Sequence, residues 1–359
     1  MSRATGVSIL CALAGCHTTH EQAKEEATQH WSRLRAEFKT ELASGQLDAG
    51  QFDAASVTLE QAYALDPTLP ELTPLLAKVH LANGRVAQAE QFLDGATTTV
   101  EHRAEIDYLR GIIAQQRQRW RDALAFFQSA SDNNPHEVAY LVAVSESLLQ
   151  LGRPSEALEH LEQHEDEFGW TQGYQAARAE CYEQLGRWTD AASCWRQVAD
   201  TSTHHADIRE RLAIALYRAG RFVEAVPVFN ELLADGGIDA SVTLRLAAAR
   251  CLIEDNQLSA AHTQVTVVLE RDERNLRAQH LRARIFAEQH EFQRAFQVAH
   301  RALRIAPDDI QSLELASALA TRNEDLALAR ELAARLLDLQ PGNPVGQRIL
   351  DTSTMPDNP

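Results

Sequence analysis

One pattern in the sequence is typical of a metal-binding helix, because two histidines stand one helical turn apart in His160-Leu161-Glu162-Gln163-His164. That spacing can present two imidazoles to one ion, whereas a zinc site uses at least three protein ligands. The sequence places no third ligand beside this pair, so we interpret it as a solvated helix face. His204 and His205 lie in a polar turn and have the same interpretation. The sequence therefore predicts neither a metal nor another cofactor.

Three cysteines outside the N-terminal region offer a second kind of chemistry, and these are Cys181, Cys194 and Cys251. Cys181 and Cys194 are predicted to lie on two neighbouring helices, so they can form a disulfide if the chain is exported to an oxidising compartment. The alternative is that they are buried as small hydrophobic side chains. We favour this alternative because cysteine is among the most buried residue types.

Motifs of catalytic and nucleotide-binding sites are missing from the sequence, which contains no phosphate-binding loop, Gly-x-Ser-x-Gly or His-Glu-x-x-His. The net charge of -17 disfavours general nucleic-acid binding, which needs a basic surface to displace counterions from phosphate. The mean hydropathy of -0.32 argues against a protein with several membrane spans. With 16 Gly, 11 Pro and abundant helix-forming residues, the composition favours long helices joined by short turns. We therefore predict an all-α protein that is not an enzyme.

The N-terminus has the arrangement of a secretory signal, in which Arg3 precedes an apolar stretch over residues 4–13. This stretch is too short to span a bilayer as a helix. It ends in Leu13-Ala14-Gly15-Cys16, which resembles the bacterial lipobox, in which the cysteine is lipidated and becomes the first mature residue. The resemblance implies a lipoprotein signal peptide over residues 1–15 and lipid attachment to Cys16.

Residues 16–35 are predicted to form a polar tether and a leading helix, with helix established by Trp31. One acyl chain anchors only marginally, so stable attachment needs the several chains of a processed lipoprotein. The lipobox resemblance implies a location at the bacterial cell envelope, facing the periplasm. His17, rather than Asp, follows the cysteine, and in the enterobacterial lipoproteins that the motif resembles this implies the outer membrane. A cytoplasmic location is the alternative.

A repeat becomes visible when the chain is aligned on one alanine column, whose members are 34 residues apart except for one step of 36. The members of this column are Ala55, Ala89, Ala123, Ala157, Ala191, Ala225, Ala261, Ala295 and Ala329. Twelve residues before them stand the small residues Ala43, Ala77, Gly111, Ser145, Ala179, Ala213, Ala249, Ala283 and Ser317. Small side chains at both positions allow the two helices of a repeat to approach closely.

Other residue types also recur in each repeat. The turn between the two helices contains Gly50, Gly84, Gly152, Gly186 or Gly220, and a left-handed conformation is easily accessible only to glycine. Two residues later comes a large apolar residue that is predicted to fill the core: Phe52, Val86, Trp120, Trp188, Phe222, Leu258, Phe292 or Leu326. Four second helices are predicted to end just before Pro67, Pro135, Pro307 and Pro341, because proline cannot continue a helix.

A 34-residue period with this order of glycine, large apolar residue, alanine and proline resembles the tetratricopeptide-repeat (TPR) family. The resemblance covers residues 36–345 and implies an all-α, right-handed superhelical solenoid of about nine TPR helix-turn-helix repeats. Residues 346–359 show no periodic apolar face, so we predict a disordered C-terminal tail there. The repeats leave no stretch of the roughly 100 residues that a separate catalytic domain needs.

Two places depart from the repeat pattern. The single step of 36 coincides with Ala234-Asp235-Gly236-Gly237 and predicts a two-residue insertion in a loop. In the fourth repeat Pro154 replaces the large apolar residue, and the chain runs through residues 165–170 without a closing proline. We therefore predict a kink or a lengthened turn between the fourth and fifth repeats.

The TPR resemblance implies a concave groove, lined by the first helix of each pair, that takes an extended peptide or a helix. In repeats six to eight the groove-facing residues that it assigns are Arg211, Tyr217, Arg218, Arg250, Arg277, His280 and Arg284. In repeats three to five they include Tyr108, Gln115, Glu146, Glu180 and Glu183. Because arginine pairs bidentately with carboxylates, we hypothesise that the C-terminal groove binds an acidic segment. The alternative is a solvated face that pairs with its own Glu and Asp.

These features predict a non-enzymatic scaffold or adaptor that is anchored by lipid at the cell envelope and binds a protein or peptide partner. They predict no nucleic-acid partner and no small-molecule substrate. Two alternatives are kept. The first is a structural or assembly subunit of an envelope or surface apparatus. The second is a cytoplasmic TPR subunit that regulates an enzyme on another chain.

Overall fold

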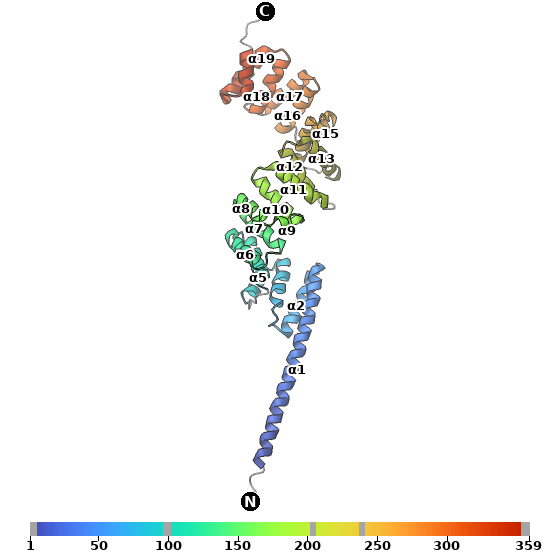
Figure 1. Cartoon of the computed structure of the whole chain (residues 1–359). Helices are drawn as coiled ribbons and strands as arrows, with labels where there is room; N and C mark the ends of the chain where they lie inside the picture. The colour runs from blue at the N-terminus through green and yellow to red at the C-terminus, as the bar shows by residue number, and fades with distance from the viewer. Residues whose placement is uncertain (1–5, 96–101, 202–205, 237–240, 353–359) are drawn as a thin grey trace, which may run out of the picture. The chain divides into compact units, whose positions relative to one another are not determined.

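The computed structural model describes residues 6–95, 102–201, 206–236 and 241–352, with the backbone alone described for residues 6–20. Over these ranges the chain forms helices and no strands, as predicted (Figure 1). The chain divides into two compact units, Met1–Ala177 and Arg178–Pro359. Each unit is built of antiparallel helices, and the described ranges contain nine first helices that are each followed in the chain by a second helix, which confirms the predicted fold class.

The helix bounds follow the predicted period. The first helices of the pairs are α1 (Gly6–Asp48), α3 (Leu72–Ala82), α5 (Arg103–Gln116), α7 (Val138–Gln150), α10 (Gln172–Gln184), α12 (Ala206–Arg218), α14 (Val242–Glu254), α16 (Leu276–Glu288) and α18 (Ile310–Arg322). The second helices are α2 (Phe52–Leu65), α4 (Val86–Asp94), α6 (Trp120–Asn133), α8 (Pro154–Glu162), α11 (Trp188–Thr201), α13 (Phe222–Gly236), α15 (Leu258–Arg271), α17 (Phe292–Ile305) and α19 (Leu326–Leu339). Two further helices, α9 (Glu165–Phe168) and α20 (Pro344–Thr352), follow the fourth and the ninth pairs.

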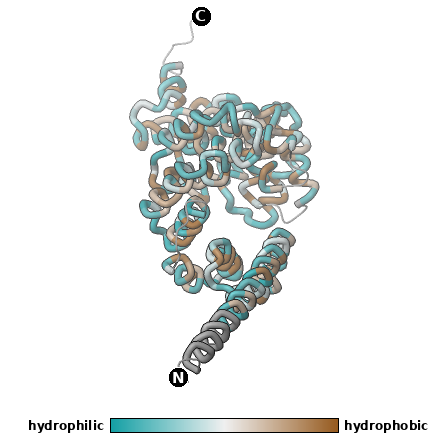
Figure 2. The backbone as a smooth tube through the Cα atoms, turned by 60° about the horizontal axis from the view of Figure 1, so that its bottom comes forward, coloured by the Kyte–Doolittle hydropathy of each residue, from teal (hydrophilic) through white to brown (hydrophobic). Residues whose placement is uncertain are grey.

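Both columns of small residues lie in the core, as predicted. All nine alanines of the first column have at most 1% of their surface exposed, and every member of the second column is buried. Hydrophobic and hydrophilic residues alternate along the helices (Figure 2). The buried residues recur at helical spacing, as in amphipathic helices. The core is therefore built repeat by repeat from contacts between successive helices.

The turns between the paired helices share one backbone conformation. The five predicted turn glycines all have positive φ, between 70° and 74°. In four other repeats the equivalent position is occupied by a residue with a side chain and φ between 57° and 63°, and these residues are Gln118, Asn256, His290 and Glu324. The left-handed turn is thus required by the repeat geometry even where the sequence provides no glycine.

The large apolar residue after each turn is the first residue of the second helix, and it fills the core only in part. Trp120 and Trp188 are half-buried, whereas 41% of Phe52 and 50% of Leu326 is exposed. The prediction that this column fills the core is therefore wrong for Phe52 and Leu326. A residue at the start of a helix lies at the end of the helix pair, where fewer neighbouring side chains surround it.

The N-terminal region differs from the predicted tether. α1 is one continuous helix from Gly6 to Asp48, so it is helical well before Trp31, and it continues beyond α2 in Figure 1. Cys16 falls in the part of α1 of which only the backbone is described, and the predicted lipid attachment stays a prediction. None of the helices in the described ranges is long and apolar enough to cross a membrane.

The C-terminal region is also more ordered than predicted. Residues 344–352 form α20, which packs against α18 and α19. Ile349 is buried, and Val345 and Leu350 pack beside it on Ala329 and Ala333. The predicted disordered tail at 346–359 is therefore wrong for its first seven residues, because an apolar face of one short helix covers the last repeat. Residues 353–359 lie outside the described ranges.

The predicted irregularity between the fourth and fifth repeats is confirmed. α8 is a short helix that ends at Glu162, and the extra helix α9 follows it before α10 begins. Phe168 of α9 is buried, and the Tyr174 hydroxyl donates a hydrogen bond of 3.0 Å to the Leu161 carbonyl. The predicted insertion near Gly237 falls largely on residues 237–240, which are not described.

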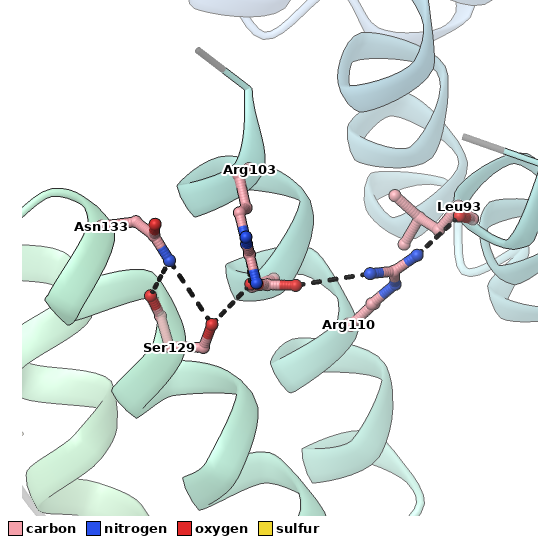
Figure 3. A network of polar contacts seen from close by, with 6 residues as sticks. Leu93, Arg103, Arg110, Ser129 and Asn133 are labelled. Carbon is pink, nitrogen blue, oxygen red and sulfur yellow. Dashed lines mark hydrogen bonds and ion pairs between the residues drawn. The ribbon is translucent and has the colours of Figure 1, made fainter. Parts of the chain in front are cut away.

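A polar network joins α4, α5 and α6 in the first unit (Figure 3). Asp107 is 7% exposed and accepts hydrogen bonds from Ser129 Oγ at 2.7 Å and from Arg110 Nη1 at 3.3 Å. Arg110 Nη2 also donates to the Leu93 carbonyl at the end of α4, at 3.0 Å, and Arg103 Nε lies 4.0 Å from Asp107. One carboxylate thus links the second repeat to both helices of the third.

Candidate functional site

A groove of about 690 Å³ runs along the first helices of the last four repeats in the second unit. The residues that line it are Tyr217, Arg218, Thr243, Leu246, Ala247, Arg250, Arg277, His280, Leu281, Arg284, Gln311, Glu314, Leu315, Ala318 and Val345. The apolar part of the lining includes Leu246, Leu281 and Leu315, and α20 contributes Val345. Six of the seven residues assigned to a groove from the sequence lie in this one lining, and the exception is Arg211.

The groove residues come from the same register positions in successive repeats. Arg250 on α14, Arg284 on α16 and Ala318 on α18 each follow the second-column residue of their own repeat directly. A 34-residue shift likewise relates Leu281 on α16 to Leu315 on α18. Because equivalent positions in stacked repeats point in the same direction, they form parallel rows along the groove.

Three groove arginines have no carboxylate partner among the described residues. The Arg250 guanidinium lies over the rings of Tyr217 and Phe222, 5.8 and 5.7 Å from their centroids. Arg218 lies in the same way over Trp188, at 5.7 Å, and Arg277 makes no hydrogen bond, ion pair or ring contact within the described ranges. An aromatic ring holds a guanidinium by its face. The planar N–H donors of these arginines therefore stay available for an incoming carboxylate.

Arg284 differs from its equivalent Arg250, because it is already paired. Its Nη2 lies 3.0 Å from Glu254 and its Nε 3.9 Å from Glu288. The lining also contains one carboxylate, Glu314, which accepts a hydrogen bond of 2.6 Å from the Asn343 amide. The groove therefore has more positive than negative charge, although the whole chain is acidic.

His280 lines the groove but is mostly buried, and its ring contacts the next groove helix. Its Nε2 lies 2.7 Å from Ser312 Oγ and 3.2 Å from Asp309 Oδ2, at the N-terminus of α18. Burial lowers the pKa of His280 below its ordinary value of 6.5, although the neighbouring Asp309 acts in the opposite direction. A neutral imidazole that joins α16 to α18 fixes the spacing of two groove helices.

Arg211 lies outside the groove lining, and its charge is compensated. Its Nη1 is 3.0 Å from Glu180 and 3.4 Å from Glu183, and its guanidinium lies 4.9 Å from the Trp195 ring centroid. Burial raises the pKa of Glu183, although this carboxylate accepts a hydrogen bond from the Trp195 indole. For Arg211, the alternative of a helix face that pairs with its own carboxylates describes the structure better.

The sequence-based interpretation missed the carboxylate Glu314 and the apolar lining residues Leu246, Leu281, Leu315 and Val345. Glu314 stands one period after His280, so extending the register by one repeat would have found it. Val345 had no such signal, because its segment was predicted to be a disordered tail.

The structure describes some of the histidines and cysteines that the sequence offered as other candidate sites. His160 and His164 are adjacent, with ring centroids 5.8 Å apart, and the described residues contain no cluster of three His, Cys, Asp or Glu that could hold a metal. His204 and His205 lie outside the described ranges. Cys181, Cys194 and Cys251 are buried and are not joined in disulfide bonds, and burial raises the pKa of Cys181 and of Cys251 to about 12.

Comparison with family models gives two matches. A model described as a tetratricopeptide repeat matches residues 40–101, 176–240 and 246–310, which together make up more than half of the chain. A model described as the N-terminal domain of the ESX-1 secretion system protein EccA1 matches residues 71–172.

Comparison with known proteins gives one curated relative and similar solved structures. Cellulose synthase operon protein C of Pseudomonas fluorescens is 23% identical over 346 residues, which are 90% of this chain and 27% of that protein. The structure of PilF from Pseudomonas aeruginosa is similar with a TM-score of 0.52 and 16% identity, and covers 62% of this chain and 99% of PilF. YrrB, described as a TPR protein with an unusual peptide-binding site, has a TM-score of 0.47 and 16% identity, covering 52% of this chain and 95% of YrrB.

Proposed function

Because this chain belongs to the tetratricopeptide-repeat family, we propose that it is a non-enzymatic scaffold whose C-terminal groove binds an acidic peptide or helix of a partner protein. The repeat fold supports the coarser part of this proposal, a protein-interaction role. The finer part rests on one observation, the three groove arginines that lack a carboxylate partner among the described residues. Arg218 and Arg250 are held by aromatic rings, and Arg277 is free to extend into the groove.

The apolar residues of the lining define the partner further. Leu246, Leu281 and Leu315 line the same groove as the arginines. A ligand that satisfies both features has apolar side chains on one face and carboxylates beside them. An acidic amphipathic segment has this arrangement, and bidentate arginine–carboxylate pairs would fix its register.

A direct test uses a short fluorescein-labelled peptide that alternates Glu and Leu, with a peptide of alternating Lys and Leu for comparison. We expect the full chain to bind the acidic peptide, with an affinity that falls as salt is added. Arg277→Glu, and the double change Arg250→Glu with Arg284→Glu, should each weaken binding by at least about 10-fold, because each removes a charge-assisted bond.

The matched control is Arg274→Glu, because Arg274 is exposed but lies outside the groove lining. This variant makes the same change in net charge and should leave binding unchanged. Equal weakening by Arg274→Glu and Arg277→Glu would show a general charge effect and contradict the groove proposal.

We also propose that the chain is anchored at the bacterial cell envelope by lipid on Cys16. The support is the sequence Leu13-Ala14-Gly15-Cys16 at the end of an apolar segment. Mass spectrometry of the N-terminal peptide from native membranes tests this proposal. A diacylglyceryl group on Cys16, abolished in Cys16→Ala, is the expected result, whereas an unprocessed Met1 would favour the cytoplasmic regulatory alternative.

The second candidate function is an assembly subunit of an envelope apparatus. The similarity to cellulose synthase operon protein C over 90% of this chain favours it, although this chain corresponds to 27% of that protein. Crosslinking in intact cells distinguishes the two functions. An adaptor should give partners that the groove variants lose, whereas an assembly subunit should keep its partners in those variants.

A further inference from the structure

The first helix carries a stripe of large apolar side chains that nothing in the described residues covers. Trp31 is 66% exposed, Leu34 42%, Phe38 68% and Leu42 47%. Their spacing of three and four residues places them on one side of α1. The opposite side of α1 is buried in the first repeat and consists of Ala36, Thr40, Ala43 and Leu47.

The repeat register shows what kind of surface this stripe is. The register is counted from Ala43, the second-column residue of the first repeat. Phe38 stands five residues before it, Leu42 one residue before it and Gly45 two residues after it. In the second repeat the equivalent residues are Leu72, Leu76 and Val79, and all three are buried in a cluster with Leu59 and Ala62 of the preceding α2.

The same positions are covered throughout the later repeats. The position equivalent to Gly45 is buried in each of these repeats. The positions equivalent to Phe38 and Leu42 are buried or half-buried. The exposed face of α1 therefore corresponds to the surface that contacts the preceding repeat elsewhere in the array. It has the apolar side chains of such a surface, but no preceding helix covers it within the described residues.

At the other end of the repeat array, the equivalent surface is covered within the described residues. The last repeat is already covered by α20, through Val345, Ile349 and Leu350. The other side chains of α20 include Gln347, Arg348 and Asp351, which are exposed. Among the described residues, the helix α20 therefore stands where a second copy would have to pack for head-to-tail stacking.

The stripe is instead complementary to itself. Leu34 and Leu42 stand four residues before and after Phe38, and Trp31 and Gly45 stand seven residues before and after it. If two α1 helices pair antiparallel about an axis at Phe38, each Leu34 faces Leu42 of the other copy. Each Trp31 then faces Gly45, so the largest side chain of the stripe lies opposite the smallest.

The surroundings of Gly45 fit this pairing. A Cβ at Gly45 would meet nothing within 4 Å, so packing within the chain does not require glycine there. A surface hollow adjoins this residue and is lined by Phe38, Glu41, Leu42, Gly45, Gln46, Ala49 and Gln51. A tryptophan from a second copy can occupy such a hollow.

We propose that a second copy of this chain covers the α1 stripe, and that two α1 helices pack antiparallel around a two-fold axis at Phe38. Such an isologous contact closes after two copies and leaves no open end for a filament. The stripe from Trp31 to Gly45 is about 21 Å long at the rise of an α-helix. An interface this small predicts a dimer that dissociates in the micromolar range.

Sedimentation velocity of the full chain, from about 1 to about 100 μM, tests the proposal across the range in which such an interface dissociates. We expect a monomer–dimer equilibrium. Phe38→Glu should raise the dissociation constant by about 100-fold or more, since it places two unpaired carboxylates on the axis. Gly45→Leu fills the hollow and should also weaken the dimer, while circular dichroism stays unchanged because the added side chain meets open space in one copy.

The matched control is Val223→Glu, which places the same charge at another exposed apolar residue, on α13. It should leave the dissociation constant unchanged. A protein that stays monomeric over the whole range, or a dimer unaffected by Phe38→Glu, would overturn the proposal.

The orientation is tested separately by disulfide crosslinking in a chain with Cys11→Ser and Cys16→Ser. One sample of this chain carries Leu34→Cys and the other Leu42→Cys. After mixing and mild oxidation, we expect crosslinks between unlike copies to predominate. Crosslinks mainly between like copies would indicate parallel helices and contradict the proposed axis.

Discussion

Gly111 on α5 directly faces the ring of Phe127 on α6, and a Cβ at this glycine would lie 2.4 Å from a ring carbon. The equivalent position in the other repeats is alanine or serine. We expect Gly111→Ala to lower the free energy of unfolding by about 1–3 kcal/mol, because the buried ring has to move within a packed core. Urea denaturation followed by circular dichroism measures the change.

A double variant makes that expectation specific. Phe127→Leu removes part of the ring that the new methyl group meets, so Gly111→Ala should cost less in this background than in the native one. Equal costs in both backgrounds would mean that Phe127 does not set the size limit at residue 111.

Four turn residues with side chains have positive φ, and replacing one of them with glycine should stabilise the protein. Glu324 has φ 63° at the position where Gly220 has φ 74°. Glu324→Gly should raise the free energy of unfolding by about 0.5–1 kcal/mol, because the left-handed conformation is strained for residues with a Cβ. Gly220→Ala should lower it by about 1 kcal/mol, for the same reason. Thermal denaturation of both variants tests the pair, and a loss of stability in Glu324→Gly would contradict the explanation.

In the network of Figure 3, the buried carboxylate of Asp107 should contribute more to the free energy of unfolding than the side chains that donate to it. Asp107→Ala leaves Ser129 and Arg110 without their shared acceptor. We expect it to lower the free energy of unfolding by about 2–3 kcal/mol, whereas Ser129→Ala should lower it by about 1 kcal/mol. Asp107→Asn keeps an acceptor oxygen, so its loss of stability should lie between those of Asp107→Ala and Ser129→Ala. Chemical denaturation measures all three, and equal stabilities for Asp107→Ala and the native chain would show that solvent replaces the network.

Stability should decrease on mild acidification. Burial holds the pKa of His80, His160 and His280 below the ordinary value of 6.5. In this pH range the unfolded chain then binds more protons than the folded chain, so the free energy of unfolding falls as the pH drops through about 6.5 toward the lower folded pKa values. We expect a lower urea midpoint at about pH 5.5 than at about pH 7.5.

His160→Gln provides the test of that mechanism, because His160 is half-buried and its Nε2 has no hydrogen-bond partner within the described ranges. The variant should show a smaller change of midpoint over the same pH range, while His300→Gln, at an exposed position, should behave like the native chain. If the two variants have the same pH dependence, buried histidines are not its cause.

The sequence predicted most of the fold from spacing alone. The alanine column from Ala55 to Ala329 located nine second helices, and all its members are buried. The predicted prolines fall two residues after the ends of α2, α6, α17 and α19. This success has a physical reason, because each repeat contacts mainly its neighbours and a local period therefore encodes the core.

The position of the candidate groove could be predicted from the same local period. The prediction of its charges was incomplete, however. Residues such as Arg250 and Arg284 keep their direction from repeat to repeat, so the register places them in one groove. Whether each charge is free depends on side chains of other helices, and this information is absent from a 34-residue period. Arg211 and Arg250 looked alike in the sequence, yet Arg211 pairs with Glu180 and Glu183, whereas Arg250 rests on aromatic rings.

By itself, then, the sequence determined the repeat, its register, the small residues at each helix crossing and the place of the groove, because these follow from local spacing. Only the tertiary structure decided which arginines are already paired, that α20 covers the last repeat, and that the Phe38 side of α1 stays bare. Each of these depends on whether a helix from elsewhere in the chain lies against a given surface, and a periodic sequence carries that information least clearly at the two ends of the array.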